Sequence, residues 1–186
     1  AGQLHRLQLA SVGLTLLPAE VFRLPHLTQL LLPRNQLRTL PALAGLPRLT
    51  ALDLSTNLLE APPQGLASLS RLATLDLSHN QMQTLAAWPA LPALHTLRLA
   101  HNRLAALPPL AASSLPRLAL LELHHNQLSE LPHSLLRVEH APTPEHLRHA
   151  AGLSLDGNAL PAPLLLYRAR TRSGCYVAVE FCIAPR

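Results

Sequence analysis

The asparagines of this sequence recur at nearly regular intervals, so that all of them fall in one column when the chain is aligned with itself. This column constrains the fold more than any other feature. The 186-residue chain has six Asn, at intervals of 22, 23, 22, 24 and 32 residues: Asn35, Asn57, Asn80, Asn102, Asn126 and Asn158. An Asn amide carries two donor hydrogens and an acceptor oxygen, so in the interior it can bond the backbone of its own segment and of a neighbour. The column therefore predicts coils stacked on one another.

Leucines surround each Asn in the pattern L-x-x-L-x-L-x-x-N-x-L, as in "LDLSTNLL" and "LDLSHNQM". Copies of the pattern start near Leu4, Leu27, Leu49, Leu72, Leu94, Leu118 and Ala150. In the copy around Asn80, period-two alternation places Leu75 and Leu77 inward and Asp76 outward on a short strand. One coil cannot bury its own apolar face, whereas its neighbours can cover it.

The pattern resembles that of the leucine-rich repeat superfamily over nearly the whole chain. The resemblance implies an α/β solenoid: a horseshoe of about seven coils, with short parallel strands on the concave face and irregular or 3-10 segments on the convex side. The repeat tails, such as "LRTLPALAGLPR", are similar to the 22–23-residue repeats of intracellular eukaryotic and bacterial members.

The length predicts one domain, made of a solenoid over residues 1–160 and a C-terminal capping segment over residues 161–186. The capping segment resembles the ends of some intracellular members, where short helices close the stack. The coil that starts at Leu118 is 32 residues long, so we expect a convex insertion over residues 137–149, acting as a docking protrusion or as a tolerated loop. The N-terminus shows no such cap, so we expect more sequence upstream in the natural protein, and an open strand edge there could self-associate.

The outward columns of the strands give the predicted binding face. They combine acidic, basic and isolated apolar residues, which suits a protein partner of mixed charge. They contain no Phe, Tyr or Trp on which bases could stack, so we do not expect nucleic acid there. The residues predicted to bind the partner are Asp53, Asp76, Arg98, Glu122, His79, His101, His124 and His125.

Histidine precedes the repeat Asn in three successive coils, at His79, His101 and His125. The rings are close enough to interact, which allows a metal site or a pH-gated contact, but a hydrated row or ordinary contacts with a partner are favoured. Three more His lie in or beside the insertion, but no Cys or carboxylate completes a metal-ligand spacing there. We expect no metal and no cofactor.

Net charge is +5, all 15 basic residues are Arg, and Lys is absent. The lack of Lys fits either a GC-rich genome or a protein that avoids ubiquitin attachment inside a eukaryotic host. A basic row precedes the repeat starts at His26, Arg48, Arg71, Arg117 and His149. It could meet an acidic protein, an anionic lipid surface or a nucleic-acid backbone, or it could simply be solvated.

No nucleophile motif, phosphate-binding loop or pair of carboxylates at a catalytic spacing is present, so we expect no enzyme activity and no small-molecule substrate. Trp88 falls on a core position of its repeat. Cys175 and Cys182 are too poorly placed for a local disulfide and fit a reducing compartment. No apolar run is long enough to span a membrane.

The sequence thus predicts a non-catalytic protein–protein interaction module that binds a protein through its concave face. The alternative is the substrate-recognition domain of a larger bacterial effector or signalling enzyme, of the ubiquitin ligase or kinase type, whose catalytic domain lies outside this chain. We expect a monomer or weak self-association, and a cytoplasmic protein or one delivered into a host cell.

Overall fold

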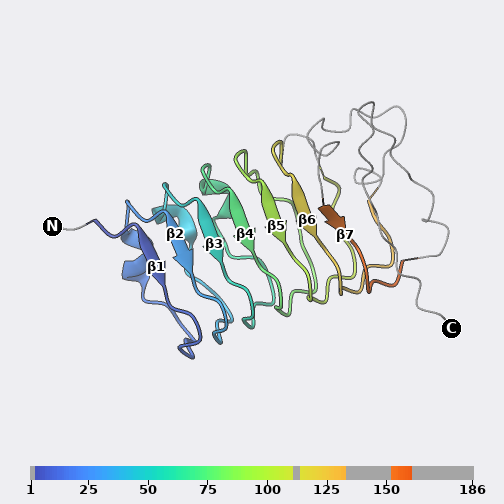
Figure 1. Ribbon diagram of the computed structural model, residues 1–186, viewed down its shortest axis with the longest axis horizontal. Coiled ribbons are helices and arrows are strands. Elements are labelled where there is room, and N and C mark those ends of the chain that lie inside the picture. The colour runs from blue at the N-terminus through green and yellow to red at the C-terminus, as the bar shows by residue number, and fades with distance from the viewer. Residues whose placement is uncertain (1–2, 111–113, 133–151, 161–186) are drawn as a thin grey trace.

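Short parallel strands stand side by side along the described chain (Figure 1). The structure is a computed structural model that describes residues 3–110, 114–132 and 152–160. In that part of the chain one sheet is formed in the order β1-β2-β3-β4-β5-β6-β7. The strands are β1 (Arg6–Gln8), β2 (Gln29–Leu31), β3 (Ala51–Asp53), β4 (Thr74–Asp76), β5 (Thr96–Arg98), β6 (Leu120–Glu122) and β7 (Gly152–Ser154).

Every strand is three residues long and pairs in register with the next one. In β2 to β6 the middle residue is a buried leucine, and the first and third residues are half-buried on the opposite side. The repeat length fixes this register, because a slip by one residue would turn the leucines to solvent. The predicted inward orientation of Leu75 and Leu77 and outward orientation of Asp76 is confirmed.

The chain returns between strands through extended segments and single turns of 3-10 helix. These turns are η1 (Ala19–Arg23), η2 (Leu43–Gly45) and η3 (Leu66–Ser68), and each buries one apolar residue. η2 packs so closely on η1 that a Cβ atom on Gly45 would collide with the carbonyl oxygen of Phe22. Gly45 therefore sets the spacing between these two coils on the side away from the sheet.

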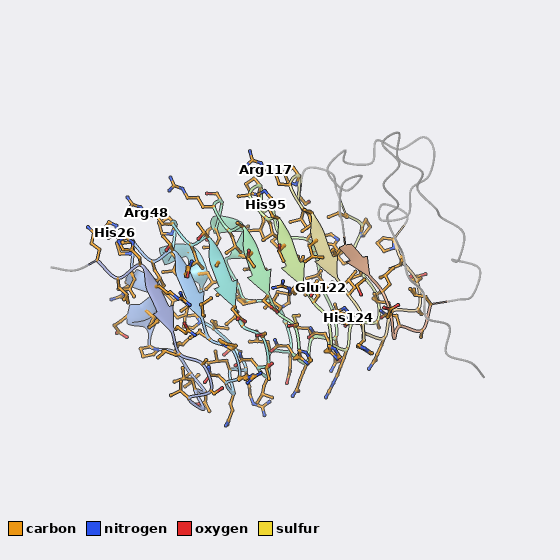
Figure 2. The ribbon with its side chains drawn as sticks, viewed as in Figure 1. His26, Arg48, His95, Arg117, Glu122 and His124 are labelled. Carbon is orange, nitrogen blue, oxygen red and sulfur yellow. The ribbon has the colours of Figure 1, made fainter. Side chains whose placement is uncertain are left out.

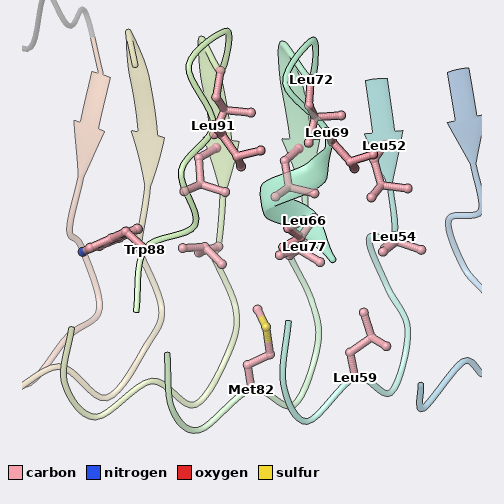
Figure 3. Packing of buried hydrophobic residues seen from close by; sticks show 14 of the residues in the cluster. Leu52, Leu54, Leu59, Leu66, Leu69, Leu72, Leu77, Met82, Trp88 and Leu91 are labelled. Atoms are coloured by element: carbon pink, nitrogen blue, oxygen red, sulfur yellow. The ribbon is translucent and has the colours of Figure 1, made fainter. Parts of the chain in front are cut away.

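Leucine fills the space between the sheet and the return segments (Figure 3). In the coil of β4, Leu72 and Leu77 are at most 2% exposed and Met82 takes the place of a leucine. Trp88 is 7% exposed, which confirms its predicted core position, and its indole Nε1 donates to the carbonyl oxygen of Pro108 at 2.7 Å. Each buried leucine stabilises the fold by about 1.5–3 kcal/mol relative to an exposed one.

The asparagine column links each coil to the one before it. The amide nitrogen of Asn80 donates to the carbonyl of Leu77 in its own coil and to that of Leu54 in the preceding coil, both at 3.0 Å. Its oxygen accepts the backbone N–H of Leu59 at 3.0 Å. Asn57, Asn102 and Asn126 repeat this arrangement. The predicted ladder is therefore confirmed.

The N-terminal coil is less well covered than the rest of the described chain. β1 forms the outer edge of the sheet, and three large apolar residues nearby are exposed: Leu4 at 46%, Val12 at 59% and Leu16 at 71%. At the other end, the predicted insertion over residues 137–149 and the capping segment over residues 161–186 lie outside the described residues.

Candidate functional site

The predicted charged residues occupy equivalent places on four neighbouring strands. Asp53, Asp76, Arg98 and Glu122 are the third residues of β3, β4, β5 and β6, and each is the register partner of the next. All four are half-buried and lie on the sheet surface opposite the leucine core. We call this surface, formed by the first and third residues of the strands, the outer face.

Arg98 joins the acidic residues on both sides of it. Its Nη1 lies 3.5 Å from Oδ2 of Asp76, and its Nε lies 3.2 Å from Oε2 of Glu122. The side chains are 39%, 16% and 25% exposed for Arg98, Asp76 and Glu122, so solvent screens both ion pairs. Pairs of this kind contribute only about 0–1 kcal/mol to stability, and their main effect is to hold the guanidinium in place.

Serines two residues further along fix the aspartates. Oδ1 of Asp53 accepts the backbone N–H of Ser55 at 2.9 Å and its hydroxyl at 2.7 Å. Asp76 holds Ser78 in the same way, at 3.0 and 2.6 Å. Sequence reasoning missed these serines, although the repeated Asp-Leu-Ser was the signal for them. Asp53 makes no ion pair with any described residue, so its second oxygen is open to a partner.

The predicted histidines meet beside the outer face in a cluster that we call the histidine ladder. The rings of His79 and His101 are stacked, with centroids 4.1 Å apart and planes 9° apart. His101 also stacks on His125 at 4.4 Å and 24°. His124 stands edge-on to His101 at 5.4 Å and to His125 at 5.6 Å. The structure therefore brings all four together.

A shared backbone conformation explains the stacking. His79, His101 and His125 all have positive φ, at 54°, 53° and 53°, in the left-handed region that non-glycine residues seldom adopt. The equivalent residue of the last described coil is Gly157, with φ 67°. A Cβ atom there would lie 2.5 Å from Nδ1 of His125, so glycine leaves room for the ring that ends the ladder.

Protonation of the histidine ladder is opposed at its centre. The pKa of His101 is lowered, first because burial disfavours its charged form and then because positive charge on His79, His125 or His124 repels a proton on it. Nδ1 of His124 is buried and has no hydrogen-bond partner among the described residues. The lowered pKa favours a neutral His101 ring, stacked between His79 and His125, at neutral pH.

The outer face and the histidine ladder combine an ion-pair network with stacked imidazole rings. Among the described residues no three His, Cys, Asp or Glu side chains are grouped in a way that could hold a metal ion. The carboxylates of Asp76 and Glu122 both face the guanidinium of Arg98. The described part of the chain also has no helix long and apolar enough to cross a membrane. Cys175, Cys182 and the histidines of the insertion lie outside the described residues.

Known proteins and structures resemble this chain in its repeats. The leucine rich repeat family model matches residues 2–59 and 92–140, and a model for two copies of the repeat matches residues 70–112. YopM from Yersinia enterocolitica is 30% identical with a TM-score of 0.67, over 85% of this chain and 30% of that chain. A leucine-rich repeat protein of Leptospira interrogans is 26% identical with a TM-score of 0.50, over 86% of this chain and 50% of that chain. No curated protein matches the chain at a significant level.

This chain thus spans 30% of the length of the first solved structure and 50% of the second, and it shares their parallel-strand solenoid. The Asn column, the leucine core and the in-register sheet are what the matched repeats would build. The chain therefore belongs to the leucine-rich repeat family.

Proposed function

We propose that the chain is a non-catalytic protein-binding module, and that its outer face is a concave surface which holds a protein partner. The residues proposed to contact the partner are Asp53, Asp76, Arg98, Glu122, His79, His101, His124 and His125. Protein interaction is the typical activity of the leucine-rich repeat family, and the order of the outer face supports it here.

The observation that carries the proposal is the network around Arg98. Its guanidinium is held between Asp76 and Glu122 at 3.5 and 3.2 Å, and Asp76 is in turn held by Ser78. These side chains are ordered before any partner arrives, so binding costs little of their conformational entropy. Within this row a positive Arg98 stands between the negative Asp76 and Glu122, which also selects a partner of complementary charge.

The same proposal includes the features of the chain that extend beyond the described residues. We place seven coils in a horseshoe over residues 1–160 and a cap over residues 161–186. The protein would need no cofactor, metal or small-molecule substrate. It would act as a monomer or associate weakly with itself, in the cytoplasm or, as an effector, inside a host cell.

A second candidate is the substrate-recognition domain of a larger bacterial effector or signalling enzyme. Its support is that both solved structures come from bacteria and that each chain is at least twice as long as the part matched here. Sequencing of the complete gene tests it directly. A ligase or kinase domain adjoining these repeats favours this candidate, and a complete gene without one excludes it.

The proposed binding face is tested by capture of protein partners from native or host lysate. The test variant is Asp76→Arg/Arg98→Glu, with Arg98→Ala as a milder change. The control variant is Arg38→Glu/Glu60→Arg, which exchanges charge in an ion pair of 3.8 Å whose side chains are both 68% exposed. Circular dichroism and thermal melting establish first that every variant is folded.

The proposal predicts that one or more proteins are captured by the wild type and the control and are lost with both outer-face variants. If the same proteins survive the outer-face variants, the proposed face is wrong. If the control loses them as well, binding depends on general charge rather than on the outer face, which also contradicts the proposal.

A further inference from the structure

A second charged surface runs along the edge of the sheet where the strands begin. The residue three positions before the strand is basic in four coils, as His26, Arg48, Arg71 and Arg117. Because the strands are parallel and in register, these residues form a row across the solenoid. Figure 2 shows His26, Arg48 and Arg117 along this edge, with Glu122 and His124 towards the other end of the strands.

Histidines extend this row and fill its one gap. The coil of β5 has Ala93 at the equivalent position, but the Nδ1 atom of His95 lies 2.7 Å from the carbonyl oxygen of Ala93. His5 makes the same kind of contact with the carbonyl oxygen of His26 at 3.1 Å. In both pairs Nδ1 must donate, because a carbonyl oxygen only accepts. We call the complete row the basic edge: His5, His26, Arg48, Arg71, His95 and Arg117.

No described residue neutralises the arginines of the basic edge. The three ion pairs of the described chain involve Arg38 and Arg98, and none involves Arg48, Arg71 or Arg117. All three are exposed. The acidic residues of the sheet stand at the third strand position, five residues downstream, or about 16 Å along an extended chain. The arginines of the basic edge therefore lie where the strands begin, and the acidic residues lie where the strands end. No ion pair within the described chain neutralises these arginines.

Arg48 shows that this edge is arranged rather than randomly oriented. Its Nη1 lies 3.0 Å from Nδ1 of His26, and since a guanidinium has only donors, that ring nitrogen accepts. The contact uses one N–H of Arg48 and leaves the others for a ligand. It also keeps the coils of His26 and Arg48 in a fixed relation.

We propose that the basic edge binds an acidic segment of a protein in extended conformation, separately from the partner of the outer face. From His26 to Arg117 the row crosses four coil-to-coil steps of about 4.8 Å, or about 19 Å. An extended segment of about six residues has that length. Guanidinium groups match carboxylates in bidentate geometry, so Asp and Glu side chains on one side of the segment meet the arginines in turn.

Other polyanions fit this edge less well. Single-stranded nucleic acid is held by stacking of bases on exposed aromatic rings, and the described aromatic residues Phe22 and Trp88 are buried. Membrane binding of a basic surface is strengthened by neighbouring apolar side chains. The exposed large apolar residues, Leu4, Val12 and Leu16, belong to the first coil and do not follow the row.

The test uses the full chain and a fluorescein-labelled oligo-glutamate peptide, with an oligo-glutamine peptide of equal length as the neutral probe. Binding is followed by fluorescence anisotropy at low and at physiological salt. The test variant is Arg48→Gln/Arg71→Gln/Arg117→Gln. The control variant is Arg34→Gln/Arg38→Gln/Arg103→Gln, which removes the same charge from residues that follow the strands.

We expect the wild type to bind oligo-glutamate and not oligo-glutamine, and we expect the test variant to weaken this binding about tenfold or more. The control variant should change it less than about twofold, because those arginines lie outside the basic edge. Equal weakening by both variants would overturn the proposal, since it would show a general effect of net charge. Tighter binding of an oligothymidylate of equal charge, or of vesicles of phosphatidylserine and phosphatidylcholine, would overturn it in favour of another partner.

Discussion

Replacement of Asn80 by Ala tests the asparagine ladder at a buried position in the middle of the described coils. The side chain of Asn80 bonds the carbonyls of Leu54 and Leu77 and the N–H of Leu59, all at 3.0 Å. The two carbonyls each keep a second bond, from Asn57 and from Asn102. Only the N–H of Leu59 loses its sole side-chain partner, and it is buried.

The expected cost follows from these bonds. An orphaned buried N–H costs about 1–3 kcal/mol, and each of the two lost bonds to a carbonyl that keeps another partner costs about 0.5–1 kcal/mol. The free energy of unfolding should therefore fall by about 2–5 kcal/mol in total. For a chain of this size that corresponds to a decrease in Tm of roughly 4–20 °C.

Asn158→Ala is the matched control. Asn158 makes the same three bonds, to Leu128, Leu123 and Leu155, but it is only half-buried, so water can replace part of what is lost. Urea unfolding followed by circular dichroism measures both variants. The reasoning is refuted if Asn80→Ala costs less than about 1 kcal/mol, or if Asn158→Ala costs as much as Asn80→Ala.

Three further changes test other parts of the structure. Gly45→Ala should lower the free energy of unfolding by about 1–3 kcal/mol, because the new Cβ collides with the carbonyl of Phe22; an unchanged urea midpoint would contradict this contact. Trp88→Phe keeps most of the packing but loses the bond to Pro108, so a loss of about 1 kcal/mol is expected in the same assay. The pKa of His101 is lowered in the folded chain. As the pH falls through the ordinary His range near 6.5, the unfolded chain therefore takes up a proton before the folded chain does. The free energy of unfolding is then smaller below this range than above it. His101→Gln should make this decrease smaller, which is measured as the urea midpoint at a series of pH values. If the midpoint depends on pH identically in the variant and the wild type, the histidine ladder is excluded as the cause of the decrease.

The sequence predicted the repeat architecture because the fold repeats one local rule. Every coil needs inward leucines and an Asn that bonds two coils, so Leu75, Leu77 and Asn80 could be placed from one copy and checked against the others. Trp88 was placed in the core by the same register, without any knowledge of its neighbours.

The details of the outer face depended on backbone angles and side-chain directions that the pattern does not contain. The row of His79, His101 and His125 was visible in the sequence, but stacking follows from their left-handed φ angles. Gly157 at the equivalent position was the available clue, because glycine is common where φ is positive. The link from Arg98 to both neighbouring acids was not predicted, although all three residues were assigned to the same column.

The basic edge shows a similar limit. The sequence placed Arg48, Arg71 and Arg117 in a row and left a gap at Ala93. His95 fills that gap because its ring turns back towards the carbonyl of Ala93, a contact between residues two apart that repeat alignment does not reveal. Alignment of the repeats predicts which residues occupy equivalent positions in successive coils. Contacts between side chains at different repeat positions become visible only in the structure.

Carboxyl labelling of the chain with and without a captured partner tests the proposed binding face most directly. Asp53, Asp76 and Glu122 report on the outer face, and the exposed residues Glu20 and Glu60 report on surfaces away from it. Carbodiimide-driven labelling is read for each residue by mass spectrometry of peptides. The proposal predicts that the partner lowers labelling of Asp53, Asp76 and Glu122 and leaves Glu20 and Glu60 unchanged. Unchanged labelling of the three outer-face residues in the presence of bound partner would contradict it.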